Sequence, residues 1–363
     1  MENIENPKET VIKHIVISGG GITGFTAYGI LKESAKEGFW DINNIKTMYA
    51  TSIGGLLMVI LSLKFDWDTL DEYIIKRPWS NIFNLNIYSL INSFQTKGLF
   101  NIKIVESVFE PLFKAKDIKM DITMKEYFEL SGIEIHLYAT DFIETKTVDI
   151  SYKTHPNWTV IESIYCSCCL PIMFTPYKKE DKIYYDGGVF SNYPLNYCCK
   201  NIDDTLSPSS TSEFSVSTPS HLQYDEILGV KTCTTDNKIE ICEESTLFDY
   251  IIMIIKSFIY KLTIDDIIPI KNEIVIYSNF TSIYNDMYLA FSTIDNRKEL
   301  INKGITLWKE FVGKAESKTE SKTESHTEPN CETIESKTKE FVGEAETQTK
   351  FVGEVESKTE PIR

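Results

Sequence analysis

Three glycine-containing turns carry the residues of this sequence that could do chemistry. Residues 19–24 (the glycine turn) read Gly-Gly-Gly-Ile-Thr-Gly, residues 50–55 (the serine turn) read Ala-Thr-Ser-Ile-Gly-Gly, and residues 186–188 (the aspartate turn) read Asp-Gly-Gly. Each turn follows an apolar run that is typical of a strand. The three turns offer backbone N–H groups, the hydroxyl of Ser52 and the carboxylate of Asp186. That set of groups could perform acyl transfer without a histidine.

Ser52 lies where a nucleophile would be exposed, between a predicted strand and a predicted helix. Such a turn requires small residues two positions before and after the serine. Gly54 fits this requirement, whereas Ala50 stands where the Gly-x-Ser-x-Gly pattern has glycine. The alternative interpretation is that Ser52 only caps the following helix, which is a common position for serine.

The glycine turn also fits the Gly-x-Gly-x-x-Gly pattern of dinucleotide-binding proteins. Both interpretations depend on N–H groups at a helix N-terminus, which attract negative charge. A dinucleotide site needs an acidic residue at the end of the next strand, but Asp41 precedes that strand. We therefore expect an oxyanion site and keep nucleotide binding as a weaker alternative. The glycines of this predicted site are Gly19, Gly20, Gly21 and Gly24.

Asp186 ends an apolar run and precedes Gly187 and Gly188, so its carboxylate could lie at the same end of the sheet as Ser52. There it could accept the serine proton, provided that partial desolvation raises its ordinary pKa of about 3.9. The alternative is a simple turn residue. None of the five histidines follows a late strand, where a Ser-His-Asp triad would place one. The histidines are His14, His136, His155, His221 and His326.

Alternating strands and helices must position these turns. Apolar runs predict strands at 14–18 and 46–51 and helices at 25–37 and 54–63, which indicates a mainly parallel sheet with helices on both faces. Residues 66–113 are expected to form helices over one end of the sheet. Within them, residues 79–100 could form an acyl-chain groove or cap, or pack as ordinary core. Further predicted strands are 133–139, 147–151, 182–185 and 273–277, and further predicted helices are 159–169, 240–260 and 283–309.

The chain is expected to have three parts. Residues 13–200 would form the catalytic domain, and residues 201–310 would contain a Ser-rich insertion followed by a C-terminal α/β completion. Residues 311–363 repeat Phe-Val-Gly and Glu-Ser-Lys-Thr and are too polar to bury a face. They are therefore predicted to be a disordered acidic tail, which could bind protein partners.

The formal net charge of −16 limits the partners of this 363-residue chain. So acidic a protein is not expected to bind nucleic acid or to be attracted electrostatically to anionic membranes. Docking on a membrane through apolar side chains is still compatible with this charge. The longest apolar stretch, residues 247–260, contains Asp249 and Lys256 and predicts no membrane span. We expect a cytoplasmic protein with peripheral membrane association. The cysteines at 166–169 are predicted to be small core residues, with a zinc site as the alternative.

Four segments together resemble the patatin-like phospholipase family. They are the glycine turn, the serine turn, the segment Ser-Cys-Cys-Leu-Pro-Ile-Met-Phe at 167–174, and the aspartate segment 184–194, which includes Asn-x-Pro. Their order and spacing agree with the family from about residue 13 to 200. Two positions depart from the family pattern: Ala50 replaces a glycine, and Thr23 stands where many members have Arg or Lys.

The resemblance implies a three-layer α/β/α fold and hydrolysis of lipid carboxylic esters, of the phospholipase A, lysophospholipase or acylglycerol lipase type. Ser52 would attack the ester with Asp186 as proton acceptor, and the N–H groups of Gly20 and Gly21 would bind the oxyanion. The substrate would be a lipid at a membrane or droplet surface, with no metal or cofactor. The alternative is a catalytically weak binding or scaffold protein. The Ile, Asn and Lys content is typical of an AT-rich genome, such as that of a large DNA virus, which would place the protein in host cytoplasm or virion.

Overall fold

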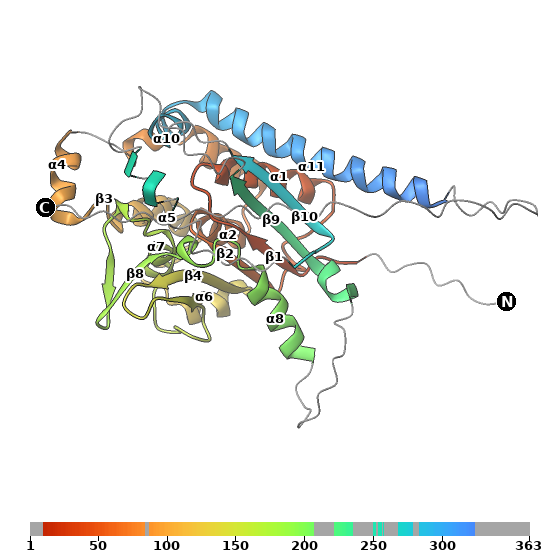
Figure 1. The fold of residues 1–363 in the computed structure, drawn as a ribbon, viewed down its shortest axis with the longest axis horizontal. Coiled ribbons are helices and arrows are strands. Elements are labelled where there is room, and N and C mark those ends of the chain that lie inside the picture. The colour runs from red at the N-terminus through yellow and green to blue at the C-terminus, as the bar shows by residue number, and fades with distance from the viewer. Residues whose placement is uncertain are drawn as a thin grey trace, which may run out of the picture. The chain divides into compact units, whose positions relative to one another are not determined.

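The fold is built on an eight-stranded, mainly parallel sheet (Figure 1). The computed structural model describes residues 10–83, 87–206, 221–234, 250–251, 253–255, 257, 268–278 and 283–323. The sheet has the strand order β10-β9-β1-β2-β4-β8-β7, and β5 pairs with β4. The five strands from β10 to β4 run parallel, whereas β8 and β5 are antiparallel to β4. The strands of this sheet are β1 (His14–Ile17), β2 (Thr47–Thr51), β4 (Glu134–Asp141), β5 (Lys146–Ile150), β7 (Tyr177–Lys179), β8 (Lys182–Asp186), β9 (Ile227–Thr234) and β10 (Asn272–Ser278).

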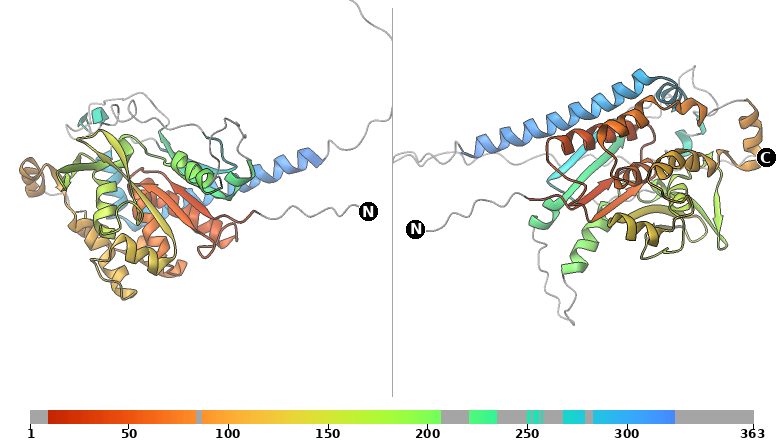
Figure 2. Two further views of the ribbon diagram at one scale, coloured as in Figure 1. Left: turned by 90° about the horizontal axis from the view of Figure 1, so that it is seen from below. Right: turned by 180° about the vertical axis from the view of Figure 1, so that it is seen from behind.

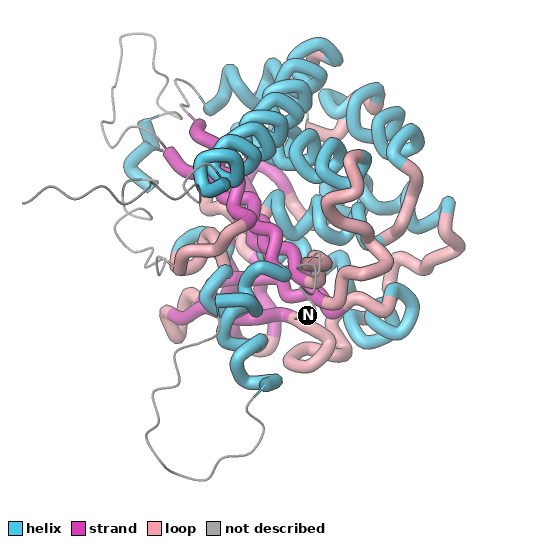
Figure 3. Tube along the Cα trace, turned by 90° about the vertical axis from the view of Figure 1, so that its right-hand side faces the viewer, coloured by secondary structure: helices cyan, strands magenta, loops and turns pink. Residues whose placement is uncertain are grey.

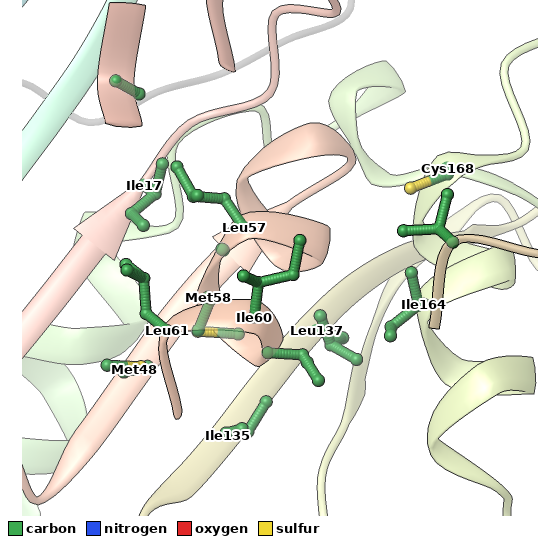
Figure 4. Close-up of a cluster of buried hydrophobic side chains, with 14 of the residues drawn as sticks. Ile17, Met48, Leu57, Met58, Ile60, Leu61, Ile135, Leu137, Ile164 and Cys168 are labelled. Atoms are coloured by element: carbon green, nitrogen blue, oxygen red, sulfur yellow. The ribbon is translucent and has the colours of Figure 1, made fainter. Parts of the chain in front are cut away.

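Helices lie on both faces of the sheet, which gives three layers (Figure 3). The larger core joins the inward side chains of Ile17, Met48 and Leu137 to the helices α1 (Thr23–Lys36), α2 (Ile53–Ser62) and α7 (Val160–Cys168) (Figure 4). On the opposite face, Tyr49 and Tyr138 pack with α8 (Leu195–Leu206). Because side chains alternate along a strand, the continuous apolar runs predicted from the sequence are buried on both faces. The predicted three-layer α/β/α fold is confirmed.

Residues 66–113 form the predicted helices beside the sheet, together with one short strand. Trp79 is buried, and its indole N–H donates to a backbone carbonyl at 2.8 Å. Phe83 stacks on Phe291 with ring centroids 4.1 Å apart. The elements of this region are α3 (Trp67–Asp71), the π-helix η1 (Glu72–Lys76), the 3₁₀-helix η2 (Trp79–Asn81), α4 (Ile87–Thr96), β3 (Gly98–Phe100) and α5 (Lys103–Ala115).

The remaining elements complete the two ends of the sheet. Capping boxes begin α6 and α7, where Thr123 and Thr159 each accept the N–H of the glutamate three residues later. The short strand β6 pairs in parallel with β3. These elements are α6 (Met124–Ser131), β6 (Ile172–Phe174), η3 (Gly187–Val189), η4 (His221–Glu226), α10 (Ile283–Ser292) and α11 (Ile294–Thr323).

Two sequence predictions need correction. The helix predicted at 283–309 is two helices, and α11 continues to Thr323, so residues 311–323 are helical and do not belong to a disordered tail. The physical reason is visible at Phe311, whose ring contacts Phe39 and Trp308 and extends the apolar side of the helix. The strand β9, which lies between β1 and β10, was not predicted. The Ser-rich insertion, most of the helix predicted at 240–260 and residues 324–363 lie outside the described residues.

Candidate active site

Ser52 stands at the apex of the turn between β2 and α2, as the sequence predicts. Its backbone has φ 55° and ψ −126°, a strained conformation for a residue other than glycine. The N–H of Ser52 donates to the Ser167 hydroxyl oxygen at 2.9 Å, and the Ser167 hydroxyl donates to the carbonyl of Tyr138 at 2.6 Å. Hydrogen bonds through Ser167, at the end of α7, therefore connect the strained turn to β4.

The small residues around Ser52 are required by close packing. A Cβ at Gly54 would lie 2.7 Å from the carbonyl oxygens of both Ile17 and Ser18. At Gly55 it would lie 2.5 Å from a methyl of Leu137. Ala50 is fully buried within β2, opposite Ile17 of β1 and Leu137 of β4. Its methyl is part of the larger core, so the fold accommodates this departure from the family pattern.

Asp186 ends β8 opposite Ala139 of β4 and is 5% exposed. Burial raises the pKa of its carboxyl to about 6, although the Ser52 side chain, as a hydrogen-bond partner, and the N–H of Gly188 at 2.8 Å both lower it. The glycine that follows is sterically required, because a Cβ at Gly187 would lie 2.2 Å from the Tyr138 carbonyl oxygen. The structure thus brings the predicted serine and carboxyl together and desolvates the carboxyl.

The glycine turn lies directly beside Ser52. A Cβ on Gly19 would be 3.3 Å from the Cβ of Ser52. The N–H of Gly19 donates to the Asn192 carbonyl at 3.0 Å, and that of Gly24 to the Gly21 carbonyl at 3.1 Å, so neither is available to an oxyanion. The N–H groups of Gly20 and Gly21 have no acceptor within the described part of the chain. Of the four predicted glycines, these two are the remaining candidate donors.

Asn192 and Thr51, which were not among the predicted site residues, hold the turns against one another. Asn192 accepts the N–H of Gly19 and donates its own side-chain amide to the Gly19 carbonyl at 3.4 Å. The hydroxyl of Thr51 donates to the Ser191 carbonyl at 2.8 Å. The Asn-x-Pro sequence after the aspartate turn was a signal for Asn192. No sequence signal marked Ser167, whose role depends on a contact across the fold.

The strand β9 supports the other side of the glycine turn. The N–H of Thr232 donates to the Ser18 hydroxyl at 2.7 Å. Thr23, which occupies the position of a family Arg or Lys, bonds through its hydroxyl to the Gly20 carbonyl at 3.1 Å and to the Thr232 hydroxyl at 3.2 Å. Thr23 therefore links the glycine turn to β9 by neutral hydrogen bonds.

Cys168 is the third side chain at the Ser52–Asp186 pair. Burial raises the pKa of its thiol well above the usual range, the Asp186 charge raises it further, and a hydrogen bond with Ser52 lowers it. The thiol is therefore neutral at physiological pH. Cys166 and Cys168 are both buried in the larger core, as their predicted role as small core residues implies.

The histidines whose side chains are described lie away from Ser52. His14 begins β1 and His136 is the third residue of β4, so both lie toward the N-terminal ends of these strands, away from the site. His136 lies between Glu134 and Asp149, at 2.9 and 2.8 Å. His155 contacts Trp158 in the segment after β5. Among these three histidines, none could complete a triad with Ser52.

The three-layer fold, with a serine on a strand–helix turn, is typical of α/β hydrolytic enzymes. A sequence profile for patatin-like phospholipases matches residues 15–198, half of the chain. The chain therefore belongs to the patatin-like phospholipase family, and this membership supports a lipid hydrolase activity.

Individual relatives are distant. A probable lipid hydrolase of Invertebrate iridescent virus 6 is 28% identical over 207 residues, which cover 55% of this chain and 69% of the relative. An uncharacterized protein of Acanthamoeba polyphaga mimivirus is 24% identical over 208 residues, 57% of this chain and 68% of the relative.

Two of the similar solved structures are of bacterial proteins. VipD from Legionella pneumophila has a TM-score of 0.39 at 13% identity, covering 81% of this chain and 67% of its own. Full-length ExoU, solved in complex with SpcU from Pseudomonas aeruginosa, has a TM-score of 0.34 at 12% identity. The match covers 83% of this chain and 52% of the ExoU chain. None of the helices within the described residues combines the length and apolar character that a membrane span requires.

Proposed function

We propose that this protein hydrolyses carboxylic esters of lipids through an acyl-serine intermediate, with Ser52 as nucleophile and Asp186 as proton acceptor. The observation that carries the proposal is the pairing of Ser52, on a strained strand–helix turn, with a buried carboxyl whose pKa is raised to about 6. A carboxylate with this pKa is mostly ionised at neutral pH and yet more basic than in water. Family membership supports the lipid as substrate class.

The proposed reaction has two steps. Ser52 Oγ attacks the ester carbonyl carbon while its proton passes to Asp186, and the N–H groups of Gly20 and Gly21 stabilise the oxyanion. The ester C–O bond then breaks, and the leaving alcohol takes the proton from Asp186. Water attacks the acyl-Ser52 ester in the second step, giving up a proton to Asp186, which returns it to Ser52 as the fatty acid leaves. In a comparable site, one oxyanion donor is worth about 2.7–4 kcal/mol of transition-state stabilisation.

The test is release of fatty acid from a panel of phospholipids, lysophospholipids and neutral glycerides by the full chain. We expect Ser52→Ala and Asp186→Ala to abolish turnover. Ser292→Ala, an exposed serine on α10, is the matched control and should retain it. A fluorophosphonate should label the wild type and not Ser52→Ala.

Three results would contradict the proposal. Turnover retained in either active-site variant would exclude the Ser52–Asp186 mechanism. Absence of turnover on the whole panel together with absence of labelling would instead favour a binding or scaffold protein. Thermal stabilisation by dinucleotides would favour the nucleotide-binding alternative.

A further inference from the structure

Two groups of large apolar side chains project from the fold into solvent. On α4, Phe94 is 86% exposed and Ile91 is 60% exposed. In the turn between β4 and β5, Phe142 and Ile143 are 60% and 58% exposed. Pairs of exposed apolar side chains on one element indicate an interaction surface. We call Ile91, Phe94, Phe142 and Ile143 the apolar rim.

The apolar rim lies at the Ser52 end of the molecule. Phe142 follows β4, which is parallel to β2, so the β4–β5 turn and Ser52 leave the sheet at the same edge. The helix α4 leads into β3, which pairs with β6, and β6 begins shortly after the end of α7 that holds the Ser52 amide. Figures 1 and 2 show α4, in orange, at the margin of the folded part in each view.

The charge of the segment around α4 is opposite to that of the chain. No Asp or Glu occurs between Glu72 and Glu106, although the chain has 53 acidic residues and a net charge of −16. Within that stretch, Lys97 directly follows α4 and Lys103 begins α5, and both are exposed. Exposed apolar side chains beside lysines, in an otherwise acidic protein, are complementary to a surface that has an apolar interior and anionic headgroups.

We propose that the apolar rim docks on a lipid surface carrying anionic headgroups, with the rim side chains entering the apolar layer and Lys97 facing the headgroups. The proposal deepens the proposed function and rests on it for the identity of the substrate, because docking at this edge brings the Ser52 turn to the lipid. It also refines the expectation from net charge, since the α4 part of the surface has no acidic residue and Glu144, in the β4–β5 turn, is paired with Lys146 and Lys182.

Vesicle co-sedimentation tests the docking separately from catalysis. The full chain carrying Ser52→Ala is mixed with vesicles of phosphatidylcholine, with and without phosphatidylglycerol. We expect binding that is stronger with phosphatidylglycerol and weakens with salt. Adding Phe94→Asp or Ile91→Asp should lower the partition coefficient about tenfold or more. The matched control is Leu130→Asp on α6, which is 59% exposed and precedes the opposite end of β4.

The outcomes separate the two proposals. Equal vesicle binding by the Phe94→Asp and Leu130→Asp proteins, with unchanged circular dichroism, would overturn the docking surface. So would a wild-type dimer that Phe94→Asp splits without affecting vesicle binding. Hydrolysis of a water-soluble short-chain ester, measured with Ser52 intact, should be unchanged by Phe94→Asp. If no ester is hydrolysed while Phe94→Asp still abolishes vesicle binding, the proposed function fails and the docking surface stands.

Discussion

Lowering the pH through 6 is the perturbation that tests the role of Asp186 most directly. Burial holds the pKa of this carboxyl at about 6, two units above its ordinary value. A proton acceptor must be ionised, so kcat/KM should follow the ionised fraction of Asp186. For a soluble ester, we expect about half of the plateau value at pH 6 and about one tenth at pH 5.

The assay is a pH profile of kcat/KM between about pH 4.5 and 8, with protein integrity checked at each pH. A profile that stays flat down to pH 4.5 would refute the reasoning. It would mean either that the carboxyl is solvated and keeps its ordinary pKa, or that another group accepts the proton. A Cys168→Ala variant is a useful comparison here: the buried thiol is neutral and accepts no proton in the proposed mechanism, so this variant should retain activity.

The same pKa shift predicts a cost in stability. Because the folded-state pKa is raised above the unfolded value of 3.8, the native state binds the proton more tightly. The stabilisation that the protonated carboxyl contributes below about pH 4 is therefore lost as the pH rises to about 6. A difference of two pKa units between the folded and unfolded states corresponds to about 3 kcal/mol of folding free energy. Asp186→Asn should therefore raise the free energy of unfolding by up to about 3 kcal/mol at neutral pH and change little at pH 4. Urea unfolding at both pH values measures this, and a variant that is less stable at neutral pH would contradict it.

Three further predictions concern the supports of the fold and site. Ser167→Ala removes the acceptor of the Ser52 amide and a donor to the Tyr138 carbonyl, so we expect a loss of about 1–3 kcal/mol in urea unfolding and a lower kcat. An unchanged kcat would show that the serine turn keeps its geometry without Ser167. Gly54→Ala should destabilise the protein by about 1–3 kcal/mol, because the new methyl would lie 2.7 Å from two rigid backbone carbonyl oxygens. Gly55→Ala should cost less, because its methyl meets a leucine methyl that can turn away. Equal unfolding midpoints for these two variants would contradict this. Arg297 is buried and donates to backbone carbonyls at 2.8–3.4 Å, so Arg297→Met should cost about 3 kcal/mol, and a melting temperature equal to wild type would count against that role.

The parts of the fold that were predicted correctly are those with strong local patterns. The strand at 14–18 and the helix at 54–63 are continuous apolar runs, and both are found as β1 and α2. The strand β9 was missed because Gly229 interrupts its short apolar run, and glycine weakens a local strand signal. The tertiary structure explains that glycine, since a Cβ there would lie 2.1 Å from the Tyr193 hydroxyl oxygen. Tyr193, dozens of positions earlier in the sequence, therefore explains why glycine occupies position 229.

The sequence by itself determined which groups could react and in what order they occur: glycine N–H groups, Ser52 and then Asp186, each after a strand. Because parallel strands end at one edge of a sheet, that order was enough to predict that the glycine turn and Ser52 meet. Asp186 ends β8, which is antiparallel to β4, so its position beside Ser52 depends on the register that sets Asp186 opposite Ala139. Only the tertiary structure decided what each group can do there. Contact with Asn192 removes the Gly19 amide from the candidate donors, and burial sets the pKa of Asp186 at about 6. Both effects depend on neighbours brought in from distant segments, and desolvation and hydrogen bonding across a packed core leave no local pattern in a sequence.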